Sequence, residues 1–126
     1  MNIYNNDKLR IRPELKDLVN DEMTKEEKFQ NATLRPILRM QHELVSLLVQ
    51  TYIENKKGVY YDLSMERKPA YIKKNILGDP KITHELRGLV IGMFTTDELA
   101  YYLENKGAIN KRIQALLHQR VCSIFV

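Results

Sequence analysis

Between residues 34 and 52, mostly apolar residues recur every three or four positions, and this spacing constrains the fold more than any other feature of the sequence. The repeating positions are Leu34, Ile37, Leu38, Gln41, Leu44, Val45, Leu48 and Tyr52, and the stripe is widened by Met40, Leu47 and Thr51. Side chains at this spacing share one face of an α-helix. Thr33 is placed to cap the start, Pro36 falls in the first turn, and Gly58 supplies a left-handed stop. The pattern predicts one long central amphipathic helix.

Start and stop signals of the same kind predict further helices after Gly58. The expected helices cover residues 64–77, 79–94, 95–105 and 109–124. Gly78 and Gly107 are placed as stops, and residues 59–63 read as an extended connector. The helix over 79–94 has little polar surface, so we expect it at the buried centre. The sequence thus predicts an all-α fold: a single compact domain of five or six helices.

The first 30 residues are polar and of mixed charge, and Pro13 interrupts any helix there. Thr24 stands three residues before Glu27, a spacing that can cap a short helix. We interpret residues 1–30 as a polar N-terminal arm that packs on a helical domain of residues 31–126.

Charge and composition argue against nucleic acids and membranes as partners of this protein. The chain carries 20 Lys and Arg against 16 Asp and Glu, a formal charge of +4, but the basic residues are interspersed with acids and gather only in pairs. No phosphate-binding stripe is evident, so nucleic acid is not the favoured partner. The single cysteine, Cys122, excludes an intrachain disulfide, and no window holds the roughly 18 apolar residues of a membrane span. No signal-like segment is evident at Met1, so we expect a soluble cytoplasmic protein without a membrane partner.

Two His-Glu-Leu triplets, at His42 and at His84, raise the question of a metal or catalytic site. Adjacent residues on a helix point about 100° apart, so a histidine and the glutamate beside it cannot converge on one ion. Neither triplet has a second ligand three or four residues on. A metal held jointly by His42 and His84 would require two helices to bring them together. We favour structural roles, and we predict no metal and no cofactor.

Gly88 and Gly92 are a second candidate site. Each glycine costs roughly 1 kcal/mol relative to alanine inside a helix, and the four-residue spacing places both on one side. There they can let another backbone approach, either within the chain, at a dimer interface, or around a ligand in a groove.

Arg120 is the third candidate because it lies on the apolar side of the last helix. It either extends its head past the core, which we favour, or is buried and paired. Glu43, Glu85 or Glu98 could supply the opposite charge.

Several segments resemble a family of small uncharacterised bacterial helical proteins, some of whose members are automatically labelled glyoxalase. The resemblance lies in N-A-T-L-R-P-I-L-R-M-Q-H-E-L, G-V-Y-Y-D-L-S, Y-I-K-K-N-I and G-L-V-I-G-M-F-T-T-D-E-L-A-Y-Y. It covers about Phe29 to Arg120. Metal-dependent glyoxalases of the β-type place His and Glu ligands on strands, whereas this sequence has a helical period, so no catalytic residues carry over.

The sequence therefore favours an interaction or regulatory module that binds an unknown protein partner or associates with itself as a homodimer. The alternative is a small-ligand-binding protein or enzyme that uses His42, His84 and Arg120. A weak nucleic-acid binder is the third possibility.

Overall fold

The computed structural model describes residues 3–15 and 19–125, and within these ranges every regular element is helical, as the sequence predicted. In chain order the elements are α1 (Ile3–Ile11), α2 (Lys25–Phe29), η1 (Gln30–Leu34), α3 (Arg35–Met40), α4 (His42–Asn55), η2 (Val59–Asp62), α5 (Lys68–Tyr71), η3 (Ile72–Ile76), α6 (Pro80–Ile91), α7 (Thr96–Glu104) and α8 (Lys106–Phe125). In the described part, no helix is both long enough and apolar enough to cross a membrane.

The predicted long central helix is divided in two. α2, η1 and α3 follow one another without a break as one rod from Lys25 to Met40, and α4 begins after Gln41. Gln41 leaves helical geometry, with φ −89° and ψ 10°, and its side-chain amide donates to the Leu89 carbonyl at 3.0 Å. With this division the described chain has seven helical rods, and not five or six.

The start of the first long rod also differs from the prediction. Thr24 caps it by accepting a hydrogen bond from the Glu27 N–H, as the sequence suggested. Thr33 is not a cap: it is buried in η1, a π-helical turn. A proline ring inside an α-helix collides with the carbonyl four residues earlier, and the wide turn just before Pro36 provides a way to relieve this crowding.

The predicted signals from Gly58 onwards are confirmed at the helix caps and wrong at two other places. Gly58 has φ +65°, Asp79 caps α6, and Thr95 with Glu98 forms the expected capping box. Residues 59–62 form a 3₁₀ turn and not an extended connector, and Gly107 lies inside α8 and stops nothing.

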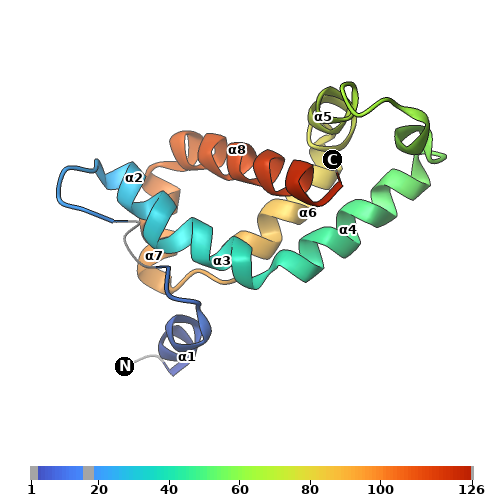
Figure 1. Cartoon of the computed structure of the whole chain (residues 1–126). Coiled ribbons are helices and arrows are strands. Elements are labelled where there is room, and N and C mark those ends of the chain that lie inside the picture. Colours follow the sequence, from blue (N-terminus) through green and yellow to red (C-terminus); the bar gives the residue numbers. More distant parts are fainter. Residues whose placement is uncertain (1–2, 16–18, 126) are drawn as a thin grey trace.

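α8, and not α6, occupies the centre of the fold. It packs against η1, α4, η3 and α7, and in Figure 1 it runs alongside α3. Its buried residues are Ile109, Ile113, Leu116, Leu117 and Val121. α6 buries one face, but His84, Glu85 and Gly88 on its other face are exposed, so the expected burial of the whole helix is wrong.

A buried ion pair fastens the N-terminal segment to α7. Arg12 donates to both Glu98 oxygens, at 2.7 and 2.9 Å, and to the Met93 carbonyl at 3.0 Å. The two side chains are only 7% and 16% exposed. Glu98 also accepts from the Thr33 hydroxyl at 3.1 Å and from the Thr95 N–H at 2.9 Å. One carboxylate therefore joins the N-terminal segment, η1 and the start of α7.

Replacing Glu98 by glutamine separates the ion pair from the helix cap. The amide oxygen can still accept from the Thr95 N–H, but Arg12 loses its counter-charge. We expect Glu98→Gln to lower the free energy of unfolding by about 2–4 kcal/mol, because the remaining charge stays largely buried. Urea denaturation measures this, with Glu104→Gln, an exposed acid on the same helix, as the control expected within about 0.5 kcal/mol. Equal effects of the two substitutions would contradict the role of the ion pair.

The same carboxylate predicts a pH dependence. Burial raises the pKa of Glu98, but the hydrogen bonds from Arg12, the Thr95 N–H and Thr33, with the charge of Arg12, outweigh burial and lower it overall. A lowered pKa means that the stabilisation is complete above the pKa of an unfolded glutamate, about 4.3, and is lost as the pH falls further. We expect the stability difference between wild type and Glu98→Gln to be constant above about pH 5.5 and to shrink below about pH 4. A difference that grew on acidification would contradict this.

Candidate functional site

An apolar groove, here called the leucine groove, lies between α4 and α6. It is a hollow of about 340 Å³ lined by Leu44, Leu47, Leu48, Thr51 and Leu89. Leu44, in the first turn of α4, is 50% exposed, and Leu47, one turn further on, is 65% exposed. A cluster of exposed leucines on a regular helix is typical of a surface that binds another molecule.

Two polar contacts hold the walls of this groove together. Gln41, at the start of α4, donates to the backbone carbonyl of Leu89 in α6. Nearer the other end of α4, the Tyr52 hydroxyl donates to Glu85. The groove is thus bordered at both ends by contacts between its two helices, so its shape is set by the fold.

The sequence held a signal for this groove. The apolar stripe of residues 34–52 contains all four α4 residues that line the groove: Leu44, Leu47, Leu48 and Thr51. The buried residues of α4 are Val45, Val49 and Ile53, and two of them lie outside the predicted stripe. The buried face of α4 is therefore displaced from the stripe, and much of the stripe on α4 lines the groove.

The structure changes the interpretation of Gly88 and Gly92. Both glycines are exposed, and a Cβ built on Gly88 would have no atom within 4 Å. A Cβ on Gly92 would meet only the Gly88 carbonyl, at 3.1 Å. No other helix of the described chain packs on Gly88, so close approach within the chain is not the reason for this glycine. Gly88 precedes Leu89 in the chain but does not itself line the leucine groove.

His42 and Arg120 are brought together from α4 and α8. The distance from Arg120 Nη1 to His42 Nδ1 is 2.8 Å. A guanidinium has only donors, so Nδ1 accepts and the neutral ring carries its proton on Nε2. Arg120 is half-buried, and none of the three suggested acids forms an ion pair with it. Glu98 pairs with Arg12, and Glu85 accepts from Tyr52. Glu43 lines a small hollow together with His42 and Arg120. Burial lowers the pKa of Arg120, and the charges of Arg39 and Arg35 lower it further.

The described part of the chain shows neither a group of metal-ligating side chains nor an activated cysteine nucleophile. His84 lies exposed on α6, and no three His, Cys, Asp or Glu residues of that part gather as metal ligands. Cys122 Sγ lies 3.5 Å from His118 Nε2, a contact that the sequence analysis did not consider. Burial raises the pKa of the Cys122 thiol, whereas a nucleophilic cysteine needs a lowered one.

Comparisons of the chain with protein-family models, with curated proteins and with solved structures found no match. The resemblance to small bacterial helical proteins therefore stays a prediction.

Two alanine substitutions test the exposed position of Gly88. Gly88→Ala should raise the free energy of unfolding by about 0.5–1 kcal/mol, because the methyl group meets open space and alanine favours a helix. Gly78→Ala is the contrasting variant, since a Cβ there would lie 2.3 Å from the Lys74 carbonyl oxygen. It should lower the free energy of unfolding by about 1–3 kcal/mol. Thermal and urea denaturation of both variants decide the matter, and destabilisation by Gly88→Ala would contradict the open surface.

Proposed function

We propose that the protein is an interaction module that binds an amphipathic helix of a partner protein in the leucine groove. The observation that carries this proposal is the exposure of Leu44 and Leu47 beside Leu48 and Leu89 in one hollow. Helix-in-groove recognition uses apolar side chains at positions i, i+3 or i+4, and i+7 of the bound helix. A row of leucines along α4 presents a surface of matching chemistry.

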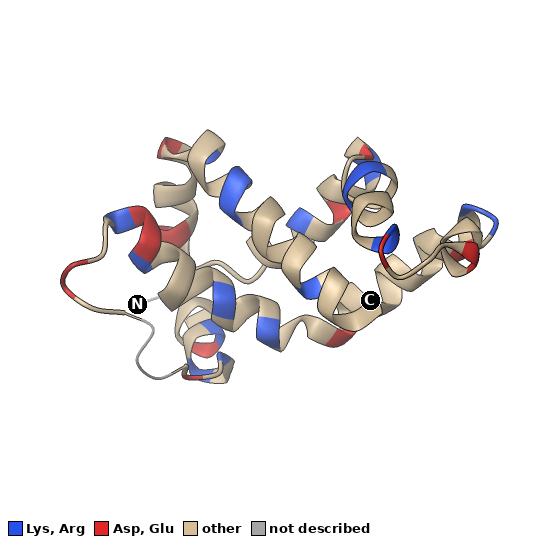
Figure 2. Cartoon of the chain, turned by 45° about the horizontal axis from the view of Figure 1, so that its top comes forward, with Lys and Arg blue, Asp and Glu red and all other residues tan. Residues whose placement is uncertain are grey.

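The charges around the groove favour a basic partner helix. α4 contains no lysine or arginine, and in Figure 2 its ribbon carries red but no blue segments. Glu43 and Glu54 share the outward face of α4 with Leu47, at helical spacings of four and seven residues. Glu85 is exposed at the Tyr52 end of the groove. Lysines or arginines flanking the apolar positions of the partner helix would complement these acids.

A second copy of this chain is a less suitable occupant. Two antiparallel copies of α4 in the register centred on Leu48 and Val49 would bring Glu43 of each copy opposite Glu54 of the other. Such like-charge pairs oppose association. An enzyme is supported less well still, since the described part offers neither a metal-ligand group nor a cysteine with a lowered pKa.

A designed peptide tests the groove without knowledge of the natural partner. The probe is an 18-residue peptide of leucine and lysine with leucines at i, i+3, i+4 and i+7, and the control peptide has the same composition in scrambled order. We expect saturable binding of the first peptide only, measured by calorimetry. Leu47→Glu should weaken it about 10- to 100-fold, because burying a leucine contributes about 1.5–3 kcal/mol.

Leu103→Glu on α7 is the matched control variant, because Leu103 is 59% exposed and lies outside the groove. It should leave the affinity for the peptide unchanged. Equal binding of the scrambled peptide, or equal losses in the two variants, would overturn the proposal. Sedimentation of the free protein adds a further check: a dimer that Leu47→Glu dissociates would make a second copy the occupant and overturn the partner-helix assignment.

A further inference from the structure

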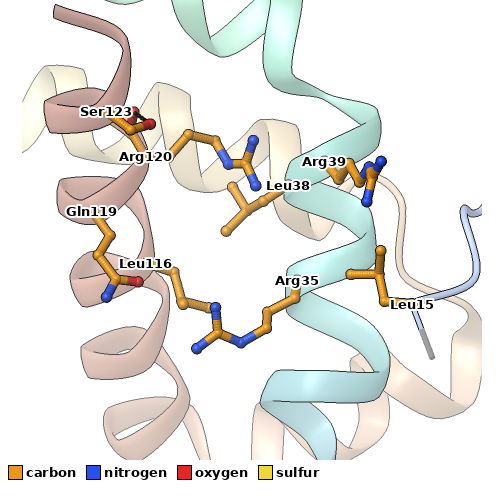
Figure 3. Close-up of a pocket in the computed structure, with 8 residues that line it drawn as sticks. All are labelled: Leu15, Arg35, Leu38, Arg39, Leu116, Gln119, Arg120 and Ser123. Atoms are coloured by element: carbon orange, nitrogen blue, oxygen red, sulfur yellow. Dashed lines mark hydrogen bonds between the residues drawn. The ribbon is translucent and has the colours of Figure 1, made fainter. Parts of the chain in front are cut away.

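A second hollow lies between α3 and α8, on the other side of Gln41 from the leucine groove. This cleft has a volume of about 450 Å³, within the range of small-molecule pockets. Its lining is Leu15, Arg35, Leu38, Arg39, Leu116, Gln119, Arg120 and Ser123. In Figure 3, Arg120 extends from α8 towards α3, and Arg35 extends from α3 towards α8. The two guanidinium groups thus enter the space between the helices from opposite sides.

In the described part of the chain no acid forms an ion pair with the arginines of this cleft, although Glu43 lines an adjoining hollow with Arg39 and Arg120. Arg35 Nε donates to Asn31 Oδ1 at 2.8 Å, and Arg120 donates to His42, so both known partners are neutral. Among residues 3–15 and 19–125, no carboxylate forms an ion pair with Arg35, Arg39 or Arg120. Arg12 shows the contrast, since its charge is met by both oxygens of Glu98.

Arg35 and Arg120 carry like charges into the same space, and an anion between them would relieve their repulsion, while Arg39 lies on the side of α3 away from α8 in Figure 3. Burial lowers the pKa of Arg120, and the charges of Arg39 and Arg35 lower it further. His42 fixes the direction of Arg120 while it remains neutral, so it orients the cation without cancelling its charge. The site is therefore prepared for an anion that brings more than one negative charge.

We propose that this cleft binds the phosphate monoester group of a small molecule. Arginine presents its donors in a planar fork that matches phosphate oxygens two at a time, and a dianionic phosphate offsets more of the charge of Arg35 and Arg120 than a carboxylate does. Gln119 and Ser123 add neutral hydrogen-bonding groups, while Leu38 and Leu116 give an organic portion of the ligand apolar contact. The cleft shares no lining residue with the leucine groove, so a negative result for one proposal leaves the other unaffected.

Calorimetric titration at low salt with three probes tests the assignment: inorganic phosphate, phenyl phosphate and benzoate. We expect saturable binding of both phosphates, tighter for phenyl phosphate because of the leucines, and weaker binding of benzoate. Arg120→Gln and Arg35→Gln should each weaken binding of phenyl phosphate about tenfold or more, since a hydrogen bond to a charged group contributes at least that much. Arg67→Gln removes an exposed arginine that does not line the cleft, and should change the affinity less than about twofold.

Thermal denaturation without ligand checks that the Arg120→Gln variant is still folded. Removing one of several repelling charges should leave the melting temperature of Arg120→Gln equal to or above that of wild type, so lost binding would not come from lost structure. The proposal is overturned if neither phosphate saturates the protein, or if the two cleft variants bind phenyl phosphate like wild type. Equal affinity for benzoate would overturn the phosphate class. A single-stranded oligonucleotide that binds more tightly than phenyl phosphate, and loses its affinity in the same variants, would make a nucleic-acid diester backbone the ligand.

Discussion

The carboxylate of Glu98 is the point on which the arrangement of the helices depends. It receives Arg12 from the N-terminal segment, Thr33 from the first long rod and the N–H of Thr95 at the start of α7. Three segments that are far apart in the chain are thereby tied to one partly desolvated charge. Because η1 and α7 both also pack on α8, this tie sets where α3 lies relative to α8. The width of the arginine-lined cleft between α3 and α8, here called the basic cleft, follows from that placement.

The break at Gln41 divides the surface of the protein into two regions of opposite character. Before it, α3 faces α8 and contributes arginines without acidic partners in the described chain. After it, α4 faces α6 and contributes exposed leucines flanked by glutamates. The break at Gln41 separates α3 from α4, and α4 packs against both α6 and α8. One irregular residue, held by its bond to the Leu89 carbonyl, thus separates a cationic cleft from an apolar groove with an acidic border.

Local chemistry could be predicted from the sequence, and contacts between distant residues could not. The caps at Thr24, Asp79 and Thr95 depend on neighbours within three residues, and these were predicted correctly. The break at Gln41 depends on α6, 48 residues away, and Arg120 meets His42 across 78 residues. His42 and Arg120 were named as candidates, but the arginines that share the cleft were missed. Their spacing along α3 is that of an ordinary solvated helix face, and only α8 makes them a cluster.

The most direct test of the central claim, that α4 and α6 form the partner-binding surface, is methyl NMR on leucine-labelled protein during titration with the leucine-lysine peptide. The account predicts shifts of the Leu44, Leu47, Leu48 and Leu89 methyl signals and intermolecular contacts from these groups to the peptide. Signals of Leu38 and Leu116 in the basic cleft, and of Leu103 on α7, should stay unchanged. Shifts centred on the cleft or on α7, with the four groove leucines unaffected, would contradict the account.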